Sequence, residues 1–467
     1  MNYCCKLNEK NWCLKLKRIV SLDFFRGLAI LCMLGFHVLI HVSYHAQTSN
    51  YSDLNEIIDS GLLPLFLLIF LLANFRALFL LVSMTIHGYI MVKAIKKGAS
   101  AGSLLKKNLF FAFMLYIVAL FCESIAANWG VLGRSIQNIA WSPEDINHIM
   151  HFETLNSIAV SIAFLSLVLY FMSRRNGIVK VKRNIIIFLV LAVMFVVSSY
   201  IISKMVHIYW PEYYSLEEQY TWSSVGEFFV KLGLAAIMGV EQPIFPFMAT
   251  TCIGGIVGIL IAQDQVSPSL PKKGMLIGLL LIIGGIIVLV LDLSEFTVEF
   301  DVFPTWFFIL TTGLELIFMM AILRMVEFSP RVAKSEKLQK FIKKSTFVRR
   351  WGMISLSIFV WQVYPEFLMR WLGNVVTGGQ VEFFIRGKAD PLSSIIMIFI
   401  VIVVWDLIIR LWEKGKFKGS FEWLMSLIGA KVLGRGRSEK PESQVSKPGE
   451  RMNIQEVLYH PEPIIFV

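Results

Sequence analysis

Apolar stretches about 20 residues long recur along the chain, and a helix of that length crosses the hydrocarbon core of a bilayer. Two shorter apolar stretches, 61–72 and 227–240, predict interfacial or half-buried helices. The expected fold class is therefore an all-α polytopic membrane protein, a bundle of about ten transmembrane helices. The predicted spans are 20–41, 74–92, 108–127, 149–172, 184–205, 243–262, 275–292, 302–323, 351–370 and 392–412.

Lysine and arginine gather in alternate connections between these spans. The N-terminal tail and the even-numbered connections are basic, including the run 324–350, whereas most odd-numbered connections are acidic or neutral. Cytoplasmic loops carry the excess of Lys and Arg. Both termini are therefore predicted to be cytoplasmic. The chain divides into a cytoplasmic tail 1–19, a transmembrane domain 20–430 and a polar cytoplasmic tail 431–467, which we expect to be disordered.

Composition agrees with this class, because charged residues make up only 16% of the chain and hydrophobic residues 56%, whereas soluble domains carry about 25% charged residues. The net charge of +11 comes mostly from the predicted inside loops. It favours membrane lipids with anionic headgroups, rather than nucleic acid, as partners. The expected location is an integral, multi-pass position in the cell membrane. The six cysteines show no disulfide framework.

The first predicted span carries five ionisable residues on one face. At about 100° per residue they fall within an arc of about 100°, and we call this set the polar stripe. Charge inside a bilayer is costly and usually faces the interior of a helix bundle or a water-filled cavity. The pattern therefore predicts that this helix forms one wall of a polar site. The stripe consists of Asp23, Arg26, His37, His41 and His45.

Each residue type in the stripe has its own chemistry. The guanidinium of Arg26 suits either a phosphate or an ion pair with Asp23. His37 follows eleven residues later, which is about 16 Å of helical rise. The i, i+4, i+8 ladder of His37, His41 and His45 would also suit a metal or haem. Acidic and cysteine partners are missing at ligand spacing around this ladder, so no metal cofactor is expected in the protein.

Three polar groups in later spans are further candidates. Glu315 lies near the middle of the eighth span and is either a functional carboxylate or a structural one. His148 and His151, followed by Glu153 and Asn156, open the fourth span on the predicted outer side. These residues either join His37 or His41 in a proton network or form a solvated helix end.

The ninth and sixth spans carry patterns of their own. Ser355, Gln362 and Glu366 share one helix face, which predicts either a cavity lining or hydrogen bonds between helices. Gly254 and Gly258 have the spacing of close helix packing. Glycine-rich phosphate loops, the Gly-x-Ser-x-Gly elbow and the His-Glu-x-x-His motif are all missing from the sequence.

The segment Ser21-Leu22-Asp23-Phe24-Phe25-Arg26-Gly27-Leu28-Ala29, followed by Phe36-His37, resembles the first helix of transmembrane acyltransferases. Similar openings occur in the acyltransferase-3 family and in heparan-α-glucosaminide N-acetyltransferase. The chain looks closest to a related uncharacterised branch of bacterial membrane proteins, in which Asn often replaces the histidine. Weaker pieces of that resemblance lie at 74–79, 245–247, 352–357 with Gln362, and 421–424.

The resemblance implies an acyl-CoA-dependent acyltransferase. It would move an acyl group, expected to be acetyl, from cytoplasmic acyl-CoA to a hydroxyl or amine acceptor, expected to be a carbohydrate, at the far face. Arg26, Asp23 and Arg18 would bind the donor. His37 would act as general base or as covalent acyl carrier, with Glu315, Glu366 or His41 orienting it. The candidate catalytic residues are thus His37, His41 and Glu315.

A second class of function fits the same residues. Interrupted helices with a mid-membrane Glu and His also suit a proton-coupled transporter, or a protein that binds lipid or another small molecule without chemistry. Such transporters are commonly built from inverted repeats, and the sequence shows none by eye. Acyl-CoA-dependent labelling of an acceptor separates the two classes.

Overall fold

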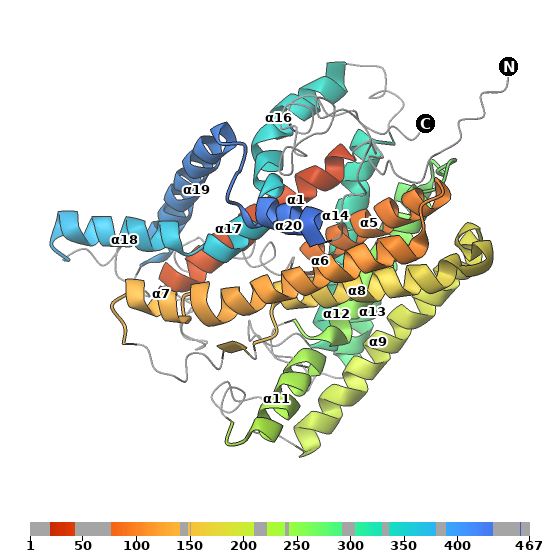
Figure 1. Cartoon of the computed structure of the whole chain (residues 1–467), viewed down its shortest axis with the longest axis horizontal. Helices are drawn as coiled ribbons and strands as arrows, with labels where there is room; N and C mark the ends of the chain where they lie inside the picture. Colours follow the sequence, from red (N-terminus) through yellow and green to blue (C-terminus); the bar gives the residue numbers. More distant parts are fainter. Residues whose placement is uncertain are drawn as a thin grey trace.

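The computed structural model describes residues 19–42, 76–140, 148–149, 151–209, 222–238, 242–291, 304–328, 336–379, 389–432 and 458. In these ranges the chain is helical (Figure 1), and nine helices are long and apolar enough to cross a membrane. The protein is therefore an integral multi-pass membrane protein, as predicted. The elements that contain these spans are α1 (Val20–Val42), α5 (Arg76–Lys96), α6 (Ala101–Phe121), α8 (Thr154–Ser173), α9 (Val181–Tyr209), α12 (Ile244–Ile261), α13 (Leu270–Leu291), α14 (Thr305–Val326) and α19 (Pro391–Lys414).

Shorter helices complete the described part of the chain. The π-helix η1 (Cys122–Ala126) continues α6, and the 3₁₀ helix η3 (Arg174–Val179) follows α8. The predicted short helix at 227–240 is confirmed as α11 (Val225–Met238). The other predicted short helix, 61–72, lies outside the described residues, as do Arg18 and His45. The remaining helices are α7 (Val131–Ile136), α16 (Glu336–Met353), α17 (Ser355–Trp361), α18 (Tyr364–Thr377) and α20 (Phe421–Val432).

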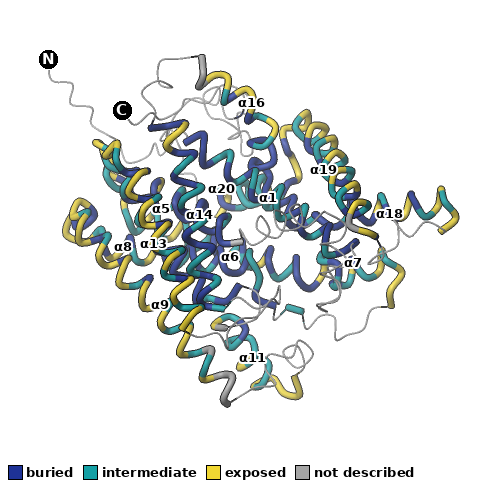
Figure 2. The backbone as a smooth tube through the Cα atoms, turned by 180° about the vertical axis from the view of Figure 1, so that it is seen from behind, coloured by how far each residue is buried: buried dark blue, intermediate teal, exposed yellow. Residues whose placement is uncertain are grey.

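The spans sort into inner and outer helices (Figure 2). In α1, α5, α8, α12 and α14, between 61% and 72% of the most apolar window is buried, whereas the corresponding share is 17% in α9 and α13. These two outer helices also have the highest mean hydropathy, 3.0. An exposed apolar surface of this extent is unfavourable in water and is stable in contact with lipid tails. The outer faces include Ile186, Leu189, Val193, Leu276, Leu280 and Ile287.

Glycines bring neighbouring helices into close contact. Gly254 and Gly258 on α12 lie against the backbone of α5, so the close packing predicted for this pair is confirmed. On α13, a Cβ at Gly285 would lie 2.8 Å from the backbone of Trp306 and Leu310 on α14. Between membrane helices, where lipid removes the hydrophobic driving force, such close backbone contact is a main source of attraction.

The predicted ninth span, 351–370, is not one continuous helix. It falls on the end of α16, all of α17 and the first half of α18, with a break at Ile354 (φ −126°, ψ 39°). A sum of apolar residues over the window could not detect this break. Among the described residues, nine helices long enough to span and one broken segment therefore stand in place of the ten expected helices.

Polar side chains from other helices form hydrogen bonds with backbone groups at the two ends of α17, inside the broken segment. The Glu422 carboxylate of α20 accepts hydrogen bonds from the amides of Leu356 (2.7 Å) and Ser357 (3.3 Å) at the start of α17. The indole of Trp405 on α19 donates to the Gln362 carbonyl at 3.4 Å. Backbone groups at membrane depth must be satisfied within the protein, so these contacts stabilise the break.

The basic run 324–350, predicted as a connection, contains most of helix α16. This helix crosses α1 so closely that a Cβ at Gly27 would collide with the Val348 carbonyl. The rings of Phe24 and Phe341 pack at 5.8 Å beside the crossing. Because the segment carries many charged residues, the sequence does not predict a membrane-spanning helix here. The apolar face of α16 is nevertheless buried against α1.

Helix ends meet in two groups at opposite ends of the bundle. At one end, the Ser21 amide donates to Glu327 after α14 (2.9 Å), and Lys93 of α5 pairs with Asp264 after α12 (3.1 Å). At the other end, the Ala389 amide before α19 donates to the Val42 carbonyl (2.9 Å). If successive spans cross the membrane in alternate directions, as the sequence predicts, these helix ends must group in this way. The Lys/Arg bias predicts that the first group is cytoplasmic.

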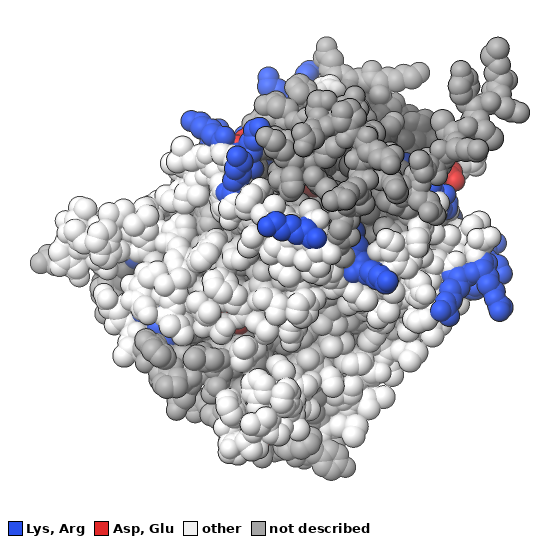
Figure 3. All heavy atoms as spheres, in the orientation of Figure 1, with Lys and Arg blue, Asp and Glu red and all other residues white. Residues whose placement is uncertain are grey.

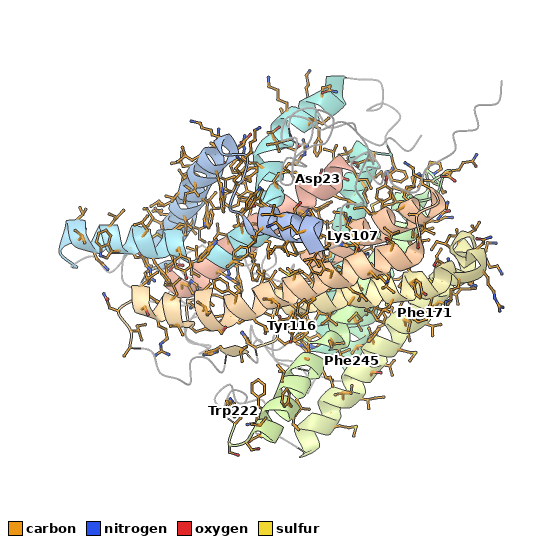
Figure 4. All side chains as sticks on the ribbon, viewed as in Figure 1. Asp23, Lys107, Tyr116, Phe171, Trp222 and Phe245 are labelled. Carbon is orange, nitrogen blue, oxygen red and sulfur yellow. The ribbon has the colours of Figure 1, made fainter. Side chains whose placement is uncertain are left out.

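The distribution of charge on the surface agrees with that assignment. Figure 3 shows Lys and Arg over the upper and right-hand parts of the molecule, near α16 and the far end of α8, and few over the lower left. In Figure 4, Asp23, Lys107 and Phe171 lie toward the basic side, whereas Trp222 and Phe245 lie toward the other. We call these the basic end and the outer end of the bundle.

Candidate functional site

The polar stripe of α1 faces the broken segment α17–α18. Near the basic end, Nη2 of Arg26 donates to the Ser355 hydroxyl of α17 at 3.0 Å. Near the outer end, Nδ1 of His41 lies 2.8 Å from Oε2 of Glu366 on α18. Two polar faces that the sequence predicts separately therefore contact each other at two points of α1. The stripe was predicted to face the interior of the bundle, and among its described residues His41 is buried, at 7% exposure.

The partners of His41 define the state of its ring. The side-chain amide nitrogen of Asn128 lies 3.2 Å from Nε2 of His41. Because an amide nitrogen donates, this contact fits the tautomer in which Nε2 accepts and Nδ1 holds the proton that faces Glu366. In that tautomer Nε2 is the basic nitrogen of the ring, and a carboxylate lies behind the other nitrogen. This arrangement is typical of a general base.

Glu366 is almost fully buried, at 1% exposure, and is compensated from three directions. His41 lies on one side, and Nε of Arg370 lies 3.2 Å from its other oxygen. The residue also stands in the first turn of α18, where the partial positive charge of the helix N-terminus favours an anion. These contacts offset the cost of burying the carboxylate and fix the orientation of the His41 ring.

A second acid–histidine cluster lies next to the first. Nδ1 of His151 is 3.2 Å from Oε2 of Glu123, and Nε2 of the same ring is 4.0 Å from Glu153. The indole of Trp129 packs against the His151 ring at 5.4 Å, and its neighbour Asn128 contacts His41. Residues 128 and 129 thus bridge the two clusters. The structure thus places His151 near the outer end of α1, and the proton network with His37 or His41 stays a prediction.

His37 and Glu315 have different surroundings from those expected. The His37 ring is half-buried and lies 6.3 Å from the His41 ring, while Glu366 contacts His41. Glu315 is fully buried in α14, and its carboxylate has no hydrogen bond of normal geometry within the described ranges, although the Leu78 amide lies near it. The described contacts pair Glu366 with His41, and which group orients His37 stays a prediction.

At the basic end, Asp23 and Arg26 are both half-buried, and Arg26 is held by Ser355. Glu327, just beyond the last residue of α14, is 1% exposed and accepts the Ser21 amide. Burial raises the pKa of Glu327 to about 8, and the nearby charge of Asp23 contributes in the same direction. The third predicted donor residue, Arg18, lies outside the described residues.

Sequence reasoning missed three residues of this site. Glu123 is a single acidic residue in an apolar span, so the criterion that selected Glu315 would also have selected it. Arg370 appears in the sequence only as one charge in a mixed loop. Asn128 gives no sequence signal, because its position depends on the π-helix that ends α6.

Comparison of the chain with models of known protein families finds no match, and a search of curated proteins finds no significant match. The resemblance to transmembrane acyltransferases therefore rests on the motifs of the first helix and on the weaker pieces named with it. It stays a prediction.

Proposed function

We propose that the protein is a membrane-embedded acyltransferase that moves an acyl group, expected to be acetyl, from cytoplasmic acyl-CoA to a hydroxyl or amine acceptor at the outer face, such as a carbohydrate. One observation carries the proposal. A single broken segment supplies a partner to both ends of the polar stripe, Ser355 to Arg26 and Glu366 to His41. A cationic group and a general base are thereby held on one helix, about 22 Å apart by helical rise.

Arg26 is the group assigned to the donor. A guanidinium presents several N–H groups in a planar fork that matches phosphate oxygens. The Ser355 hydroxyl fixes the side chain from one side at 3.0 Å, and the residue remains half-buried. A CoA diphosphate bound here would extend its thioester along the polar stripe toward the histidines.

His41 is the group assigned to the acceptor. The acceptor group displaces the Asn128 amide from Nε2 of His41. Its oxygen or nitrogen then attacks the thioester carbonyl while Nε2 takes its proton, so the new bond to carbon forms. The carbon–sulfur bond then breaks, and the imidazolium returns the proton to the CoA thiolate. The Glu366 carboxylate, 2.8 Å from Nδ1, stabilises the imidazolium in between. His37 stands beside this pair as the alternative base or acyl carrier.

Consumption of acyl-CoA by the purified protein tests the proposal. Wild-type protein in detergent or proteoliposomes is given labelled acetyl-CoA and a panel of amino sugars, neutral sugars and lipid-linked saccharides. The proposal expects acceptor-dependent release of CoA and labelled product. Wild-type protein that binds no acyl-CoA, and acetylates none of the acceptors, contradicts it.

Proton-coupled transport is the second candidate, and one observation favours it. The buried Glu315 carboxylate has no normal hydrogen bond within the described residues, and a carboxylate at membrane depth is a common proton carrier. The broken segment α17–α18 fits the same reading. A transporter would move a solute across sealed vesicles in response to a pH gradient without consuming acyl-CoA.

A further inference from the structure

We infer that Glu123, His151 and Glu153 form a binding site for a divalent transition-metal ion of the zinc class. One potential ligand atom from each residue lies within 4.8 Å of the other two. The three residues come from η1, from the turn before α8 and from the residue that caps α8. The sequence separates Glu123 from His151 by 28 positions, so spacing alone could not reveal the cluster.

The distances fit a metal polyhedron. With metal–ligand bonds of about 2.0–2.2 Å, two ligands of a tetrahedral zinc ion lie about 3.3–3.5 Å apart. Nδ1 of His151 and Oε2 of Glu123 lie 3.2 Å apart, close to that edge. Glu153 is 4.0 Å from the other ring nitrogen. One ligand atom of Glu153 already lies within 4.8 Å of the chosen atoms of the other two residues, so a small adjustment of the side chains brings the three onto one ion.

The types of ligand atom in the cluster indicate which class of metal it would bind. One imidazole nitrogen and two carboxylate oxygens suit zinc and similar transition metals, whereas calcium and magnesium prefer oxygen ligands alone. Three protein ligands also leave a fourth position for water or substrate. Glu123 is 2% exposed and His151 7%. A cation there would compensate two acidic groups that lie away from bulk water.

The surroundings hold the ligands in place. The backbone carbonyl of His151 accepts from the Asn156 side chain at 2.9 Å, and Oε2 of Glu153 accepts the Thr154 amide at 3.1 Å. Trp129 packs against the edge of the His151 ring. Outer contacts of this kind orient metal ligands and raise affinity. Glu123 is presented by a π-helix, a feature frequent at functional sites.

A metal here would tie the end of α6 to the start of α8. The connection between them contains Asn128, the residue that contacts His41, so metal binding would also hold that contact. The site itself is independent of acyl transfer. Metal binding can be confirmed or refuted whether or not the protein proves to be an acyltransferase.

The test uses full-length protein in detergent. It is stripped with a chelator, loaded with Zn²⁺, freed of excess metal by gel filtration and measured for metal content. We expect about one Zn²⁺ per chain and a higher melting temperature in the loaded form. Glu123→Gln and His151→Ala should each weaken binding at least tenfold. His87→Ala, which removes another histidine of the membrane region, should leave metal content unchanged.

Zinc-edge X-ray absorption on the loaded wild-type protein makes the test independent of how the variants fold. We expect one imidazole, with the other ligands oxygen. A sulfur ligand, or two or more imidazoles, would place the metal elsewhere and overturn the assignment. Wild-type protein that retains no Zn²⁺ after loading overturns it as well, as does full occupancy in both folded ligand variants.

Discussion

At the scale of single residues, the two histidines of the stripe differ in what surrounds them. His41 is buried between Glu366 and Asn128, whereas His37 is half-buried beside it. The sequence could place both on one face, because that needs only helical periodicity. It could not rank them, because the ranking depends on Glu366 and Asn128, which are 325 and 87 positions from His41.

The first prediction follows from that ranking. His41→Ala should lower the rate of acyl transfer by about 10² to 10⁴, the usual loss of a general base, while acyl-CoA still binds. Glu366→Gln should lower the rate less and change its pH profile, since it keeps a hydrogen bond but loses the charge. His37→Asn should keep most of the activity. The opposite result, activity lost in His37→Asn and kept in His41→Ala, would make His37 the base.

The second prediction concerns Arg26 and the donor. Arg26→Ala should weaken acyl-CoA binding in a titration on folded protein, and Arg26→Lys should restore only part of it, since a point charge replaces the fork. Ser355→Ala should weaken binding slightly, because it removes the hydroxyl that orients Arg26. If Arg26 serves only to pair with Asp23, the variants would lose stability while the affinity of the folded fraction stays normal.

The third prediction is a pH dependence of stability caused by Glu327. Its pKa is raised from 4.5 to about 8 in the folded protein, so the folded state retains a proton that the unfolded state has released. The contribution of protonated Glu327 to the free energy of unfolding is complete below about pH 4.5 and is lost as the pH rises through about 8. Glu327→Gln, which keeps an acceptor for the Ser21 amide, should therefore raise the melting temperature relative to wild type increasingly from about pH 5 to about pH 8.5.

Glu227 on α11 provides the matched control. Its hydrogen bonds to Ser223 hold the pKa of this partly exposed carboxylate at about 2. Its stabilising contribution is therefore lost only as the pH falls from its ordinary range through about 2. Glu227→Gln should show no increasing gain between about pH 5 and about pH 8.5. A constant difference between Glu327→Gln and wild type over that range would show that Glu327 is ionised in the folded protein.

At the scale of helices, the spans were predictable and their breaks were not. The apolar pattern located nine spans, because burial in lipid or in the bundle selects the same residues. The prediction of one helix over 351–370 was wrong, because the helix breaks at Ile354. Glu422, about 68 residues later, stabilises that break. The π-helix at Cys122–Ala126 is equally invisible in composition, although it positions Glu123.

The fourth prediction compares two adjacent glycines of α13. A Cβ at Gly285 would lie 2.8 Å from backbone atoms of α14, whereas a Cβ at Gly284 would have no atom within 4 Å. Gly285→Ala should force α13 from α14 and lower the melting temperature. Gly284→Ala should leave it unchanged or raise it, since Ala favours helix by about 1 kcal/mol over Gly. Equal effects of the two substitutions would contradict the observed packing of the pair.

At the scale of the whole molecule, α1 makes polar contacts with the broken segment toward both ends of the bundle. Arg26 lies at the basic end with Ser355, and His41 lies at the outer end with Glu366. The sequence predicted this direction from its Lys/Arg bias. It could not predict that one broken segment would supply the partner in both contacts, because each contact joins residues more than 300 positions apart.

Transfer of a labelled acyl group across a sealed membrane tests the central claim most directly. Proteoliposomes with the wild-type protein in one orientation receive labelled acetyl-CoA on the side of the basic end and an amino sugar on the other side. The account predicts labelled product on the acceptor side, and its loss in His41→Ala. Label that appears only on acceptor supplied on the donor side, or no labelled product on either side, would contradict the account.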